Sequence, residues 1–316
     1  MNLTNVSDNL TIPKKQKELL LAFFQSMNSI NTMKSYMNDI NKFRDFLRDN
    51  HRGVWLTEVS QYHISAYKQY LSNFGGRNLT PSTSKTINRK LASLSAFYTY
   101  LKQNNAVKSN PVKYVKRPKV STINHTVELS EVEVEKFFRE INTKSGGGKL
   151  HFAICSCLFF RGMRRNEVIN LKIKDFYSID DIFVLDYTRK GGLKEPKKIS
   201  LKVAESIIDW LDYCKDNNYS LKENDFLFRP VKNNSTKELN KSIHPSSVDY
   251  IVKKYASKAQ INKRVSPHSG RSSFICYYLD RFTAREVQLE VNHKNLETTL
   301  SYDNRRRNLI DSIIDN

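Results

Sequence analysis

The first hundred residues repeat apolar positions every three or four residues, which is the period of a helix with one buried face. This pattern predicts four helices, bounded by residues that commonly start or stop helices. We expect them after Pro13, after an Asn31 cap, over roughly Ser60–Leu71 up to Gly75-Gly76, and between Thr80-Pro81 and Asn110-Pro111. The fourth has the clearest apolar stripe, formed by Ile87, Leu91, Leu94, Tyr98 and Leu101. Together they predict a compact all-helical unit.

The pattern in the second half of the chain is mixed. Ser130 and Glu133 have the spacing of a capping box at a helix start, and Gly146–Gly148 is expected to be a loop without the Gly-Lys-Ser/Thr of a nucleotide-binding loop. Ile182–Thr188 has the composition of a strand, with Lys197–Leu201 as its return partner. The other expected helices are Leu150–Phe160, Arg164–Leu171, Val203–Tyr213, Pro245–Ala259, Ser269–Leu279, Ala284–Val291, Leu296–Tyr302 and a short one at Leu309–Ile314.

These elements predict a mostly α-helical chain with a small antiparallel sheet. A length of 316 residues favours two domains. We expect an N-terminal arm at 1–12, a helical domain at 13–112, a linker at 113–126 and a second domain at 127–316. The linker is inferred from Pro118, from its many cations and from its weak apolar periodicity.

The charge of the chain indicates what kind of partner it binds. The formal net charge is +20 and the isoelectric point about 9.7, which favours a polyanion partner, DNA or RNA first, over an ordinary basic surface. The four cysteines form neither a redox Cys-x-x-Cys nor a zinc site, so we expect no metal. Cys155 and Cys157 lie in an apolar run and are expected to be buried free thiols, which suits a reducing cytoplasm. No apolar run has transmembrane length and no signal peptide is present, so we expect a cytoplasmic protein without a membrane partner.

The candidate chemistry lies in the second half and ends at Tyr302, one of 16 tyrosines. Tyr302 lies in a polar setting, where an exposed nucleophile is expected, whereas Tyr277 and Tyr278 fall in an apolar run and are expected in the core. A tyrosine hydroxyl, with a pKa near 10, needs a proton acceptor and cations that hold the phosphate it attacks. Groups of these types precede it in the order Arg164, Lys190, His268, Arg271 and His293.

Each of these groups also has an ordinary interpretation. Arg164 opens a helix, where its parallel donors fit a phosphate but equally an ion pair, and Arg161 and Arg165 compete with it. Lys190 precedes Gly191-Gly192 on a turn and could protonate a leaving oxygen, or be a solvated lysine like its competitors Lys194, Lys197 and Lys198. His268 and Arg271 share one helix face, and His268 can accept a proton near neutral pH. His293 could contact the same phosphate or simply end a helix.

The order Arg, turn Lys, His-x-x-Arg, His and, nine residues later, Tyr resembles the tyrosine recombinase (phage integrase) family, in particular its compact Xer-like members. The resemblance extends from about Pro13 to Tyr302. It implies a helical SAM-like core-binding domain and a catalytic domain that together clamp a DNA duplex. It also implies that Tyr302 attacks a phosphate to give a 3′-phosphotyrosyl bond and a free 5′ hydroxyl, without metal, ATP or another cofactor. The family's Gly-x-Arg and Lys-Gly patterns select Arg164 and Lys190, and Glu167 would hold an arginine.

The resemblance further implies double-stranded DNA with a specific recombination site as the partner. Four protomers would assemble on two sites, with the helix at Leu309–Ile314 docked on a neighbouring subunit, or alternatively packed in cis. An accessory protein or a second recombinase stays open. The role would be integration and excision, or dimer or cointegrate resolution. Lys85, Arg89 and Lys90 lie off the apolar stripe of the fourth helix, where they form either an ordinary solvated face or phosphate contacts. The other candidate DNA contacts are Lys116, Arg117, Lys119, Arg165 and Lys194.

Three positions depart from the family pattern. Gly270 and Ser272 flank the second arginine where Leu and His are common, and Asn292 stands where Gly is frequent before the last histidine. The six principal positions are intact, so we expect activity. Two other classes stay open: a relaxing enzyme similar to type IB topoisomerases, and a catalytically silent DNA-binding protein of the same fold.

Overall fold

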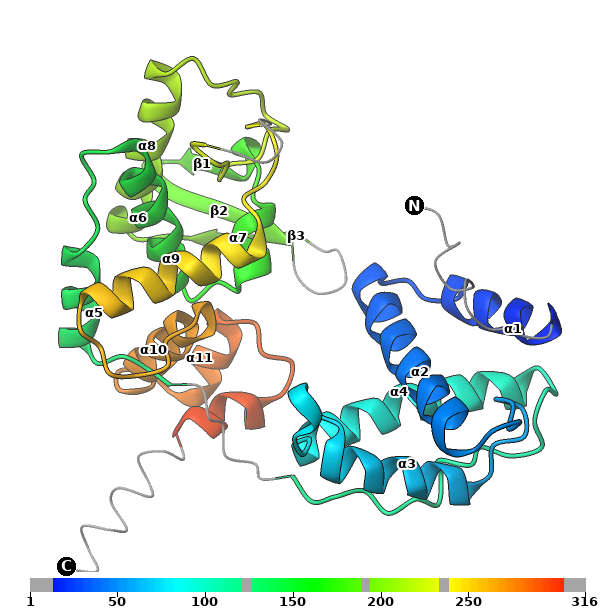
Figure 1. The fold of residues 1–316 in the computed structure, drawn as a ribbon. Helices are drawn as coiled ribbons and strands as arrows, with labels where there is room; N and C mark the ends of the chain where they lie inside the picture. The colour runs from blue at the N-terminus through cyan, green and yellow to red at the C-terminus, as the bar shows by residue number, and fades with distance from the viewer. Residues whose placement is uncertain (1–13, 121–126, 189–193, 233–238, 304–316) are drawn as a thin grey trace, which may run out of the picture. The chain divides into compact units, whose positions relative to one another are not determined.

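The computed structural model describes residues 14–120, 127–188, 194–232 and 239–303 of the chain (Figure 1). The chain divides into two compact units, Met1–Ser121 and Thr122–Asn316. The predicted N-terminal arm, the turn with Lys190 and the predicted tail helix at Leu309–Ile314 lie outside the described residues. No helix in the described part is long and apolar enough to cross a membrane.

The N-terminal unit is helical, as its apolar period predicts. Its elements are α1 (Lys14–Gln25), α2 (Ile30–Asn50), α3 (Gln61–Phe74), the 3-10 helix η2 (Arg77–Leu79) and α4 (Ser84–Gln103). All five residues of the predicted α4 stripe are buried in one core with α2 and α3. Two predicted helix starts were wrong. The side chains of Ser29 and Thr83, not those of Asn31 and the residues around Pro81, accept the first backbone N–H groups of α2 and α4.

The described part of the predicted linker runs along the N-terminal unit. Lys68 Nζ donates to the Lys116 carbonyl at 3.2 Å, and Asn88 Nδ2 donates to the Pro118 carbonyl at 2.9 Å. Arg117 Nη1 in turn donates to the Asn88 carbonyl at 3.4 Å. Hydrogen bonds at Lys116, Arg117 and Pro118 therefore join this segment to α3 and α4.

The C-terminal unit combines helices with a three-stranded antiparallel sheet in the order β1-β2-β3, so the predicted small antiparallel sheet is confirmed. Its helices are α5 (Glu131–Arg139), α6 (Gly146–Phe159), α7 (Arg165–Asn170), η3 (Ile173–Asp175), α8 (Leu201–Asp216), α9 (Pro245–Lys258), α10 (Pro267–Leu279), α11 (Ala284–Glu290) and a helical stretch at 296–303. Its strands are β1 (Phe176–Ile179), β2 (Ile182–Thr188) and β3 (Lys194–Lys198). The Ser130–Glu133 capping box is present. Strand β1 was not predicted, and β3 begins three residues earlier than expected.

The expectation of a loop at Gly146–Gly148 was wrong, because these glycines form the first turn of α6. Ser145 caps the helix by accepting the N–H of Gly148 at 3.1 Å. A Cβ on Gly148 would lie 1.7 Å from the Asn142 carbonyl oxygen, and one on Gly146 would lie 2.0 Å from the Tyr213 ring. Glycine is used here for close packing and not for turn conformation.

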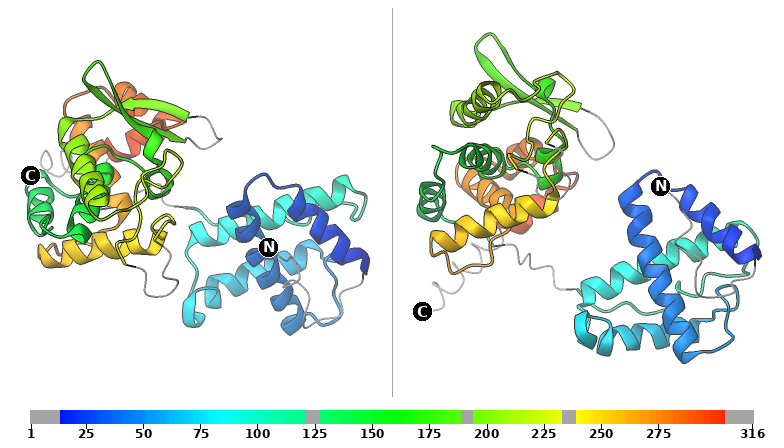
Figure 2. Two further views of the ribbon diagram at one scale, coloured as in Figure 1. Left: turned by 90° about the horizontal axis from the view of Figure 1, so that it is seen from above. Right: turned by 45° about the horizontal axis from the view of Figure 1, so that its top comes forward.

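Two further glycines bring the site elements together. Gly162 has φ +64°, which favours glycine, and its Cα faces the ring of Phe274 on α10, which a Cβ would approach to 2.5 Å. Gly270, also on α10, faces Phe159 of α6, where a Cβ would lie 3.0 Å from the ring. Phe159 therefore fills the space beside Gly270, at a position where the family commonly has Leu. Strand β3 meets the end of α11, where Lys197 Nζ donates to the Leu289 carbonyl at 3.5 Å; α10 and α11 are shown in orange in Figure 2.

Candidate active site

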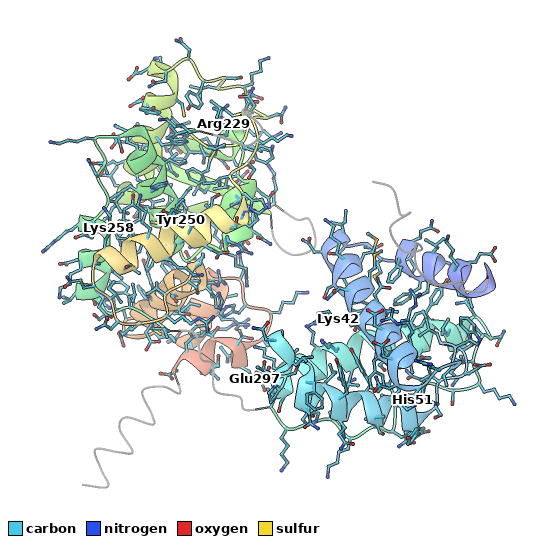
Figure 3. All side chains as sticks on the ribbon, in the orientation of Figure 1. Lys42, His51, Arg229, Tyr250, Lys258 and Glu297 are labelled. Atoms are coloured by element: carbon cyan, nitrogen blue, oxygen red, sulfur yellow. The ribbon has the colours of Figure 1, made fainter. Side chains whose placement is uncertain are left out.

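Tyr302 lies on the helix at 296–303, whose first turn includes Glu297, labelled in Figure 3. The expectation of an exposed tyrosine was wrong, because only 3% of Tyr302 is accessible. Its ring packs in a small cluster with Phe274, Ile275, Val287 and Val291. His293 is another neighbour, and its ring is stacked on that of Tyr302 at 6.1 Å between centroids and 12° between planes. Side chains of α10 and α11, together with His293, therefore cover the Tyr302 ring.

The Tyr302 hydroxyl faces His268. The distance from Tyr302 Oη to His268 Nε2 is 3.5 Å, at the long end of hydrogen bonding. His268 lies exposed in the first turn of α10, and Arg271 follows one turn later on the same face, as their spacing predicts. The arrangement places a proton acceptor between solvent and a buried hydroxyl.

Arg271 is a buried cation held by neutral groups. Only 2% of its surface is accessible, Nη1 donates to the Gly162 carbonyl at 2.5 Å, and Nη2 donates to the Val291 carbonyl. Among the residues that the structure describes, Nε has no hydrogen-bond partner. Burial, reinforced by repulsion from Arg164, lowers the pKa of Arg271 to about 10, so it stays charged at neutral pH. Carbonyl partners orient the guanidinium without neutralising it.

Arg164 is the N-cap residue of α7, and its side chain is 45% accessible. Glu167 holds it twice: Oε1 accepts from Arg164 Nη1 at 2.8 Å and Oε2 accepts the Arg164 backbone N–H at 2.7 Å. The carboxylate bridge expected of Glu167 is therefore present in the structure, while its catalytic role stays a prediction. The competing arginines are occupied elsewhere, Arg161 by Glu290 at 2.9 Å and Arg165 by Asp249.

His293 joins the same group. Its Nδ1 lies 2.9 Å from Thr299 Oγ1, a residue of the helix that carries Tyr302. Burial, followed by repulsion from Arg271, Arg164 and His268, lowers the pKa of His293 to about 4. The imidazole is thus neutral at physiological pH, and one of its nitrogens can donate a hydrogen bond.

Two of the departures from the family pattern have a structural basis here. Asn292 has φ +54°, in the left-handed region that Gly adopts freely and Asn tolerates. Ser272 is buried, and its hydroxyl donates to the His268 carbonyl at 3.1 Å within α10.

Lys190 lies outside the described residues. Of its three competitors, Lys194 begins β3 and forms an ion pair with the buried carboxylate of Asp175. Lys197 lies 3.4 Å from Glu195 and 3.6 Å from Glu290. Lys198 is exposed at the end of β3. Two of the competitors are therefore already paired with carboxylates.

The predicted DNA contacts of the N-terminal unit differ from one another. Lys90 was expected off the apolar stripe, and this placement was wrong: it is 5% accessible, and burial lowers the pKa of its ammonium. Arg89 is engaged with Asp39 at 2.5 and 2.9 Å. Those with exposed side chains and no carboxylate partner among the described residues are Lys85, Lys116, Arg117 and Lys119.

Sequence patterns gave no indication of several residues that build the site. Gly162 accepts from Arg271 through its carbonyl, and Glu195 accepts from Asn292, contacts that join segments about a hundred residues apart. The one local signal in the sequence was Gly162 itself, the glycine of the Gly-x-Arg pattern. In the described part of the chain no group of three or more His, Cys, Asp or Glu side chains is placed to share a metal ion.

Comparison with known proteins gives consistent matches over both units. Residues 124–308 match the phage integrase family, and residues 21–105 match the N-terminal SAM-like domain of phage integrases. The chain is 30% identical over 277 residues to a tyrosine recombinase of Pseudothermotoga lettingae, covering 87% of each protein. It is 27% identical over 281 residues to tyrosine recombinase XerC of Pediococcus pentosaceus, covering 86% of each.

Among solved structures, the chain is similar to XerH site-specific recombinase bound to a palindromic difH substrate in a post-cleavage complex. The TM-score is 0.67 at 17% identity, with 98% of this chain and 99% of the other covered. Identity this low supports the fold alone. With the two domain matches, it confirms the predicted SAM-like helical domain followed by a catalytic domain of this class.

Proposed function

The chain belongs to the phage integrase family of tyrosine recombinases, and we propose that it cleaves and rejoins DNA at a specific site through a covalent bond to Tyr302. One observation carries the proposal. The Tyr302 hydroxyl lies 3.5 Å from His268 Nε2, one helical turn from a buried arginine that, among the described residues, is in contact with carbonyl groups and with no carboxylate. A proton acceptor and an anion-binding cation are what a tyrosine needs in order to attack a phosphate.

In the proposed cleavage step, Tyr302 Oη forms a bond to phosphorus while the bond from phosphorus to the 5′ oxygen breaks. The tyrosine proton passes to His268, and the 5′ oxygen leaves as a hydroxyl after taking a proton, which we assign to Lys190. The product is a 3′-phosphotyrosyl bond. Because one phosphodiester replaces another, a 5′ hydroxyl from a partner strand reverses the step without ATP.

The cations and His293 would act on the phosphate itself. The non-bridging oxygens gain negative charge in the transition state, and guanidinium groups offer them parallel donors. Arg271 is supported in this role by its neutral carbonyl partners, and Arg164 by its exposure beside Glu167. His293 would donate a hydrogen bond as a neutral imidazole, in keeping with its lowered pKa of about 4.

We extend the proposal to double-stranded DNA with a specific recombination site, by analogy with XerH bound to its difH substrate. The exposed cations Lys85, Lys116, Arg117 and Lys119 are the favoured contacts to DNA phosphates. Residues 309–314 would dock on a neighbouring subunit in a tetramer on two sites, in the cytoplasm. The role would be integration and excision, or dimer or cointegrate resolution, as the resemblance to the family implies.

A supercoiled plasmid with two copies of a candidate site from the gene's own genomic neighbourhood tests the proposal. We expect exchange between the sites, seen as product circles or an inverted segment after restriction digestion, and none with Tyr302→Phe. Relaxation of the plasmid without exchange would instead assign the chain to enzymes similar to type IB topoisomerases. Tight, site-specific binding with neither product would assign it to silent DNA-binding proteins.

A further inference from the structure

Asn292 uses its side chain in a way that glycine, frequent at this position in the family, cannot. Its backbone has φ +54°, so the position needs a residue that tolerates the left-handed region. Its Nδ2 donates to Glu195 Oε2 at 2.8 Å and lies 3.5 Å from the Tyr187 hydroxyl. Glu195 precedes it by 97 residues, so the contact joins the segment before His293 to strand β3.

The two residues beside Asn292 both touch the site. The Val291 carbonyl accepts a hydrogen bond from Arg271 Nη2, and His293 Nδ1 lies 2.9 Å from Thr299 Oγ1. The backbone angles of Asn292 set the position of the Val291 carbonyl relative to the His293 ring. Anything that fixes this one residue therefore fixes contacts on both sides of Tyr302.

Strand β3 is a firm support for this contact. Tyr187 and Glu195 are partners in the register of β2 and β3. Lys197, two residues on, lies 3.4 Å from Glu195 and 3.6 Å from Glu290 of α11, and its Nζ donates to the Leu289 carbonyl at 3.5 Å. The strand is thus joined to the end of α11 at several points, and Asn292–Glu195 is the one next to His293.

We propose that Asn292 is a positioning residue, whose side chain, held by Glu195 on β3, fixes the turn that places His293 and the Val291 carbonyl for strand cleavage. The inference rests on the proposed function. Glycine allows the same φ but also many others, whereas a hydrogen bond to a carboxylate confines Asn292 to one. In this chain, the positions of His293 and the Val291 carbonyl would thereby depend on a contact with strand β3.

Asn292→Gly tests this without adding strain, because glycine is at ease at positive φ. We expect cleavage of a nicked suicide duplex under saturating protein to slow roughly 10-fold, the size of effect expected when a catalytic group is displaced by a fraction of an ångström. DNA affinity should not change. Asn218→Gly is the matched control, since Asn218 has φ +56° at the end of α8 and should retain the wild-type rate.

Glu195 supplies the second half of the test. Glu195→Ala should reproduce the loss, and the double variant with Asn292→Gly should lose no more than Glu195→Ala alone, because both changes remove the Asn292–Glu195 hydrogen bond. Glu195→Gln keeps an acceptor oxygen and should recover most of the rate. Additive losses in the double variant would contradict the proposed pairing.

A substrate with sulfur in place of the bridging 5′ oxygen distinguishes which group is displaced. A thiolate leaves without needing a proton, so this substrate would restore the rate if Asn292→Gly acted on the proton donor on the turn before β3. The inference predicts that the loss persists, because His293 and the Arg271 contact act on the phosphate. Restoration to the wild-type rate would overturn it.

A readout that needs no DNA separates this inference from the proposed function. Among the described residues, four charged or titratable side chains face His293: Arg164 at the start of α7, His268 and Arg271 on α10, and Tyr302. We expect the His293 ring to titrate near pH 4 by NMR in the wild type, and closer to 6.5 in Asn292→Gly but not in Asn218→Gly. If no adduct on Tyr302 forms yet this shift occurs, the proposed function fails and the positioning role stands. An unchanged rate and an unchanged titration in Asn292→Gly would refute the role alone.

Discussion

The two units hold a buried charge in different ways. In the N-terminal unit, Asp39 is fully buried and accepts two hydrogen bonds from Arg89, at 2.5 and 2.9 Å, and a third from Ser93 at 3.0 Å. In the C-terminal unit, Arg271 is almost as buried, but it is held by the carbonyls of Gly162 and Val291. The first charge is neutralised by its partner and the second is not.

This difference indicates which buried charges are structural and which await a ligand. In the first pair, both terminal nitrogens of Arg89 already donate to Asp39, which leaves them little capacity for a phosphate. The Arg271 guanidinium is in contact with carbonyls and only attracted from a distance by Glu167, so an arriving anion would stabilise this buried cation. The type of residue and its burial do not separate the two cases, whereas the chemistry of the partner does.

Removing Arg271 should have the largest effect on activity. We expect Arg271→Gln to slow single-turnover cleavage roughly 1,000-fold, the loss typical of a group that stabilises transition-state charge. Arg271→Lys should recover only part of the rate, since an ammonium cannot match the guanidinium's parallel donors. Rates are measured on a suicide duplex, with circular dichroism as a check on folding. A loss smaller than about tenfold would contradict the contrast drawn between Arg271 and the Arg89–Asp39 pair, because the Arg271 charge would then not stabilise the transition state.

Removing Arg89 should instead change stability. Arg89→Ala leaves the Asp39 carboxylate buried without its cation, which we expect to lower the free energy of unfolding by about 3–5 kcal/mol. Asp39→Ala should cost less, because the Arg89 side chain is 48% accessible and water can solvate it. Urea denaturation measures both. Cleavage by the folded Arg89→Ala protein at low temperature should match the wild type, and a loss as large as that of Arg271→Gln would contradict the structural assignment.

Glu167 tests the same contrast from the other side, because it is a carboxylate that pairs with a cation of the candidate active site, Arg164. Glu167→Gln keeps an acceptor for Arg164 but removes the charge, so we expect a smaller loss of cleavage rate, about tenfold, through a less well fixed guanidinium. Glu133→Gln changes the capping box of α5 in the same way and is the matched control. Equal effects of the two variants would mean that Glu167 acts only on helix stability.

The smallest expected effect concerns pH. The pKa of His293 and that of His151 are both lowered to about 4, mainly by burial. In the unfolded chain these rings take up a proton near pH 6.5, while the folded protein does so only near pH 4, so stability falls as the pH drops through this window. His151→Gln should make that fall shallower by at most about 1 kcal/mol per pH unit in denaturant titrations. An unchanged slope would show that His151 is not held neutral.

Local patterns predicted the features that depend on local structure. The α4 stripe and the Ser130–Glu133 cap involve residues three or four apart, so their spacing alone predicts the contact. The order of catalytic groups was predicted from a family resemblance, and the comparisons confirm the family. The structure brings Arg164, His268, Arg271, His293 and Tyr302 into one region, through contacts with Glu167, Gly162 and Val291.

The errors arose where distant segments decide the outcome. Tyr302 is followed by charged residues, yet its ring is buried by Phe274 and Val287 of other helices. Tyr277, expected in the core, is 37% accessible because the hydrophobic face of α10 points elsewhere, and the Arg281 guanidinium lies 3.7 Å from its ring. The spacing of apolar residues within one helix cannot predict contacts with other segments of the chain. The same holds for Asn292 and Glu195, whose pairing depends on how β3 meets the end of α11.

The central claim, that the site is built around Tyr302 as the nucleophile, is tested most directly by covalent trapping. The protein is incubated with a labelled, nicked suicide duplex and resolved on a denaturing gel. We predict a slowly migrating adduct for the wild type and for Tyr277→Phe, the tyrosine one helix away, and none for Tyr302→Phe. An adduct that survives in Tyr302→Phe, or one that disappears in Tyr277→Phe, would contradict the account.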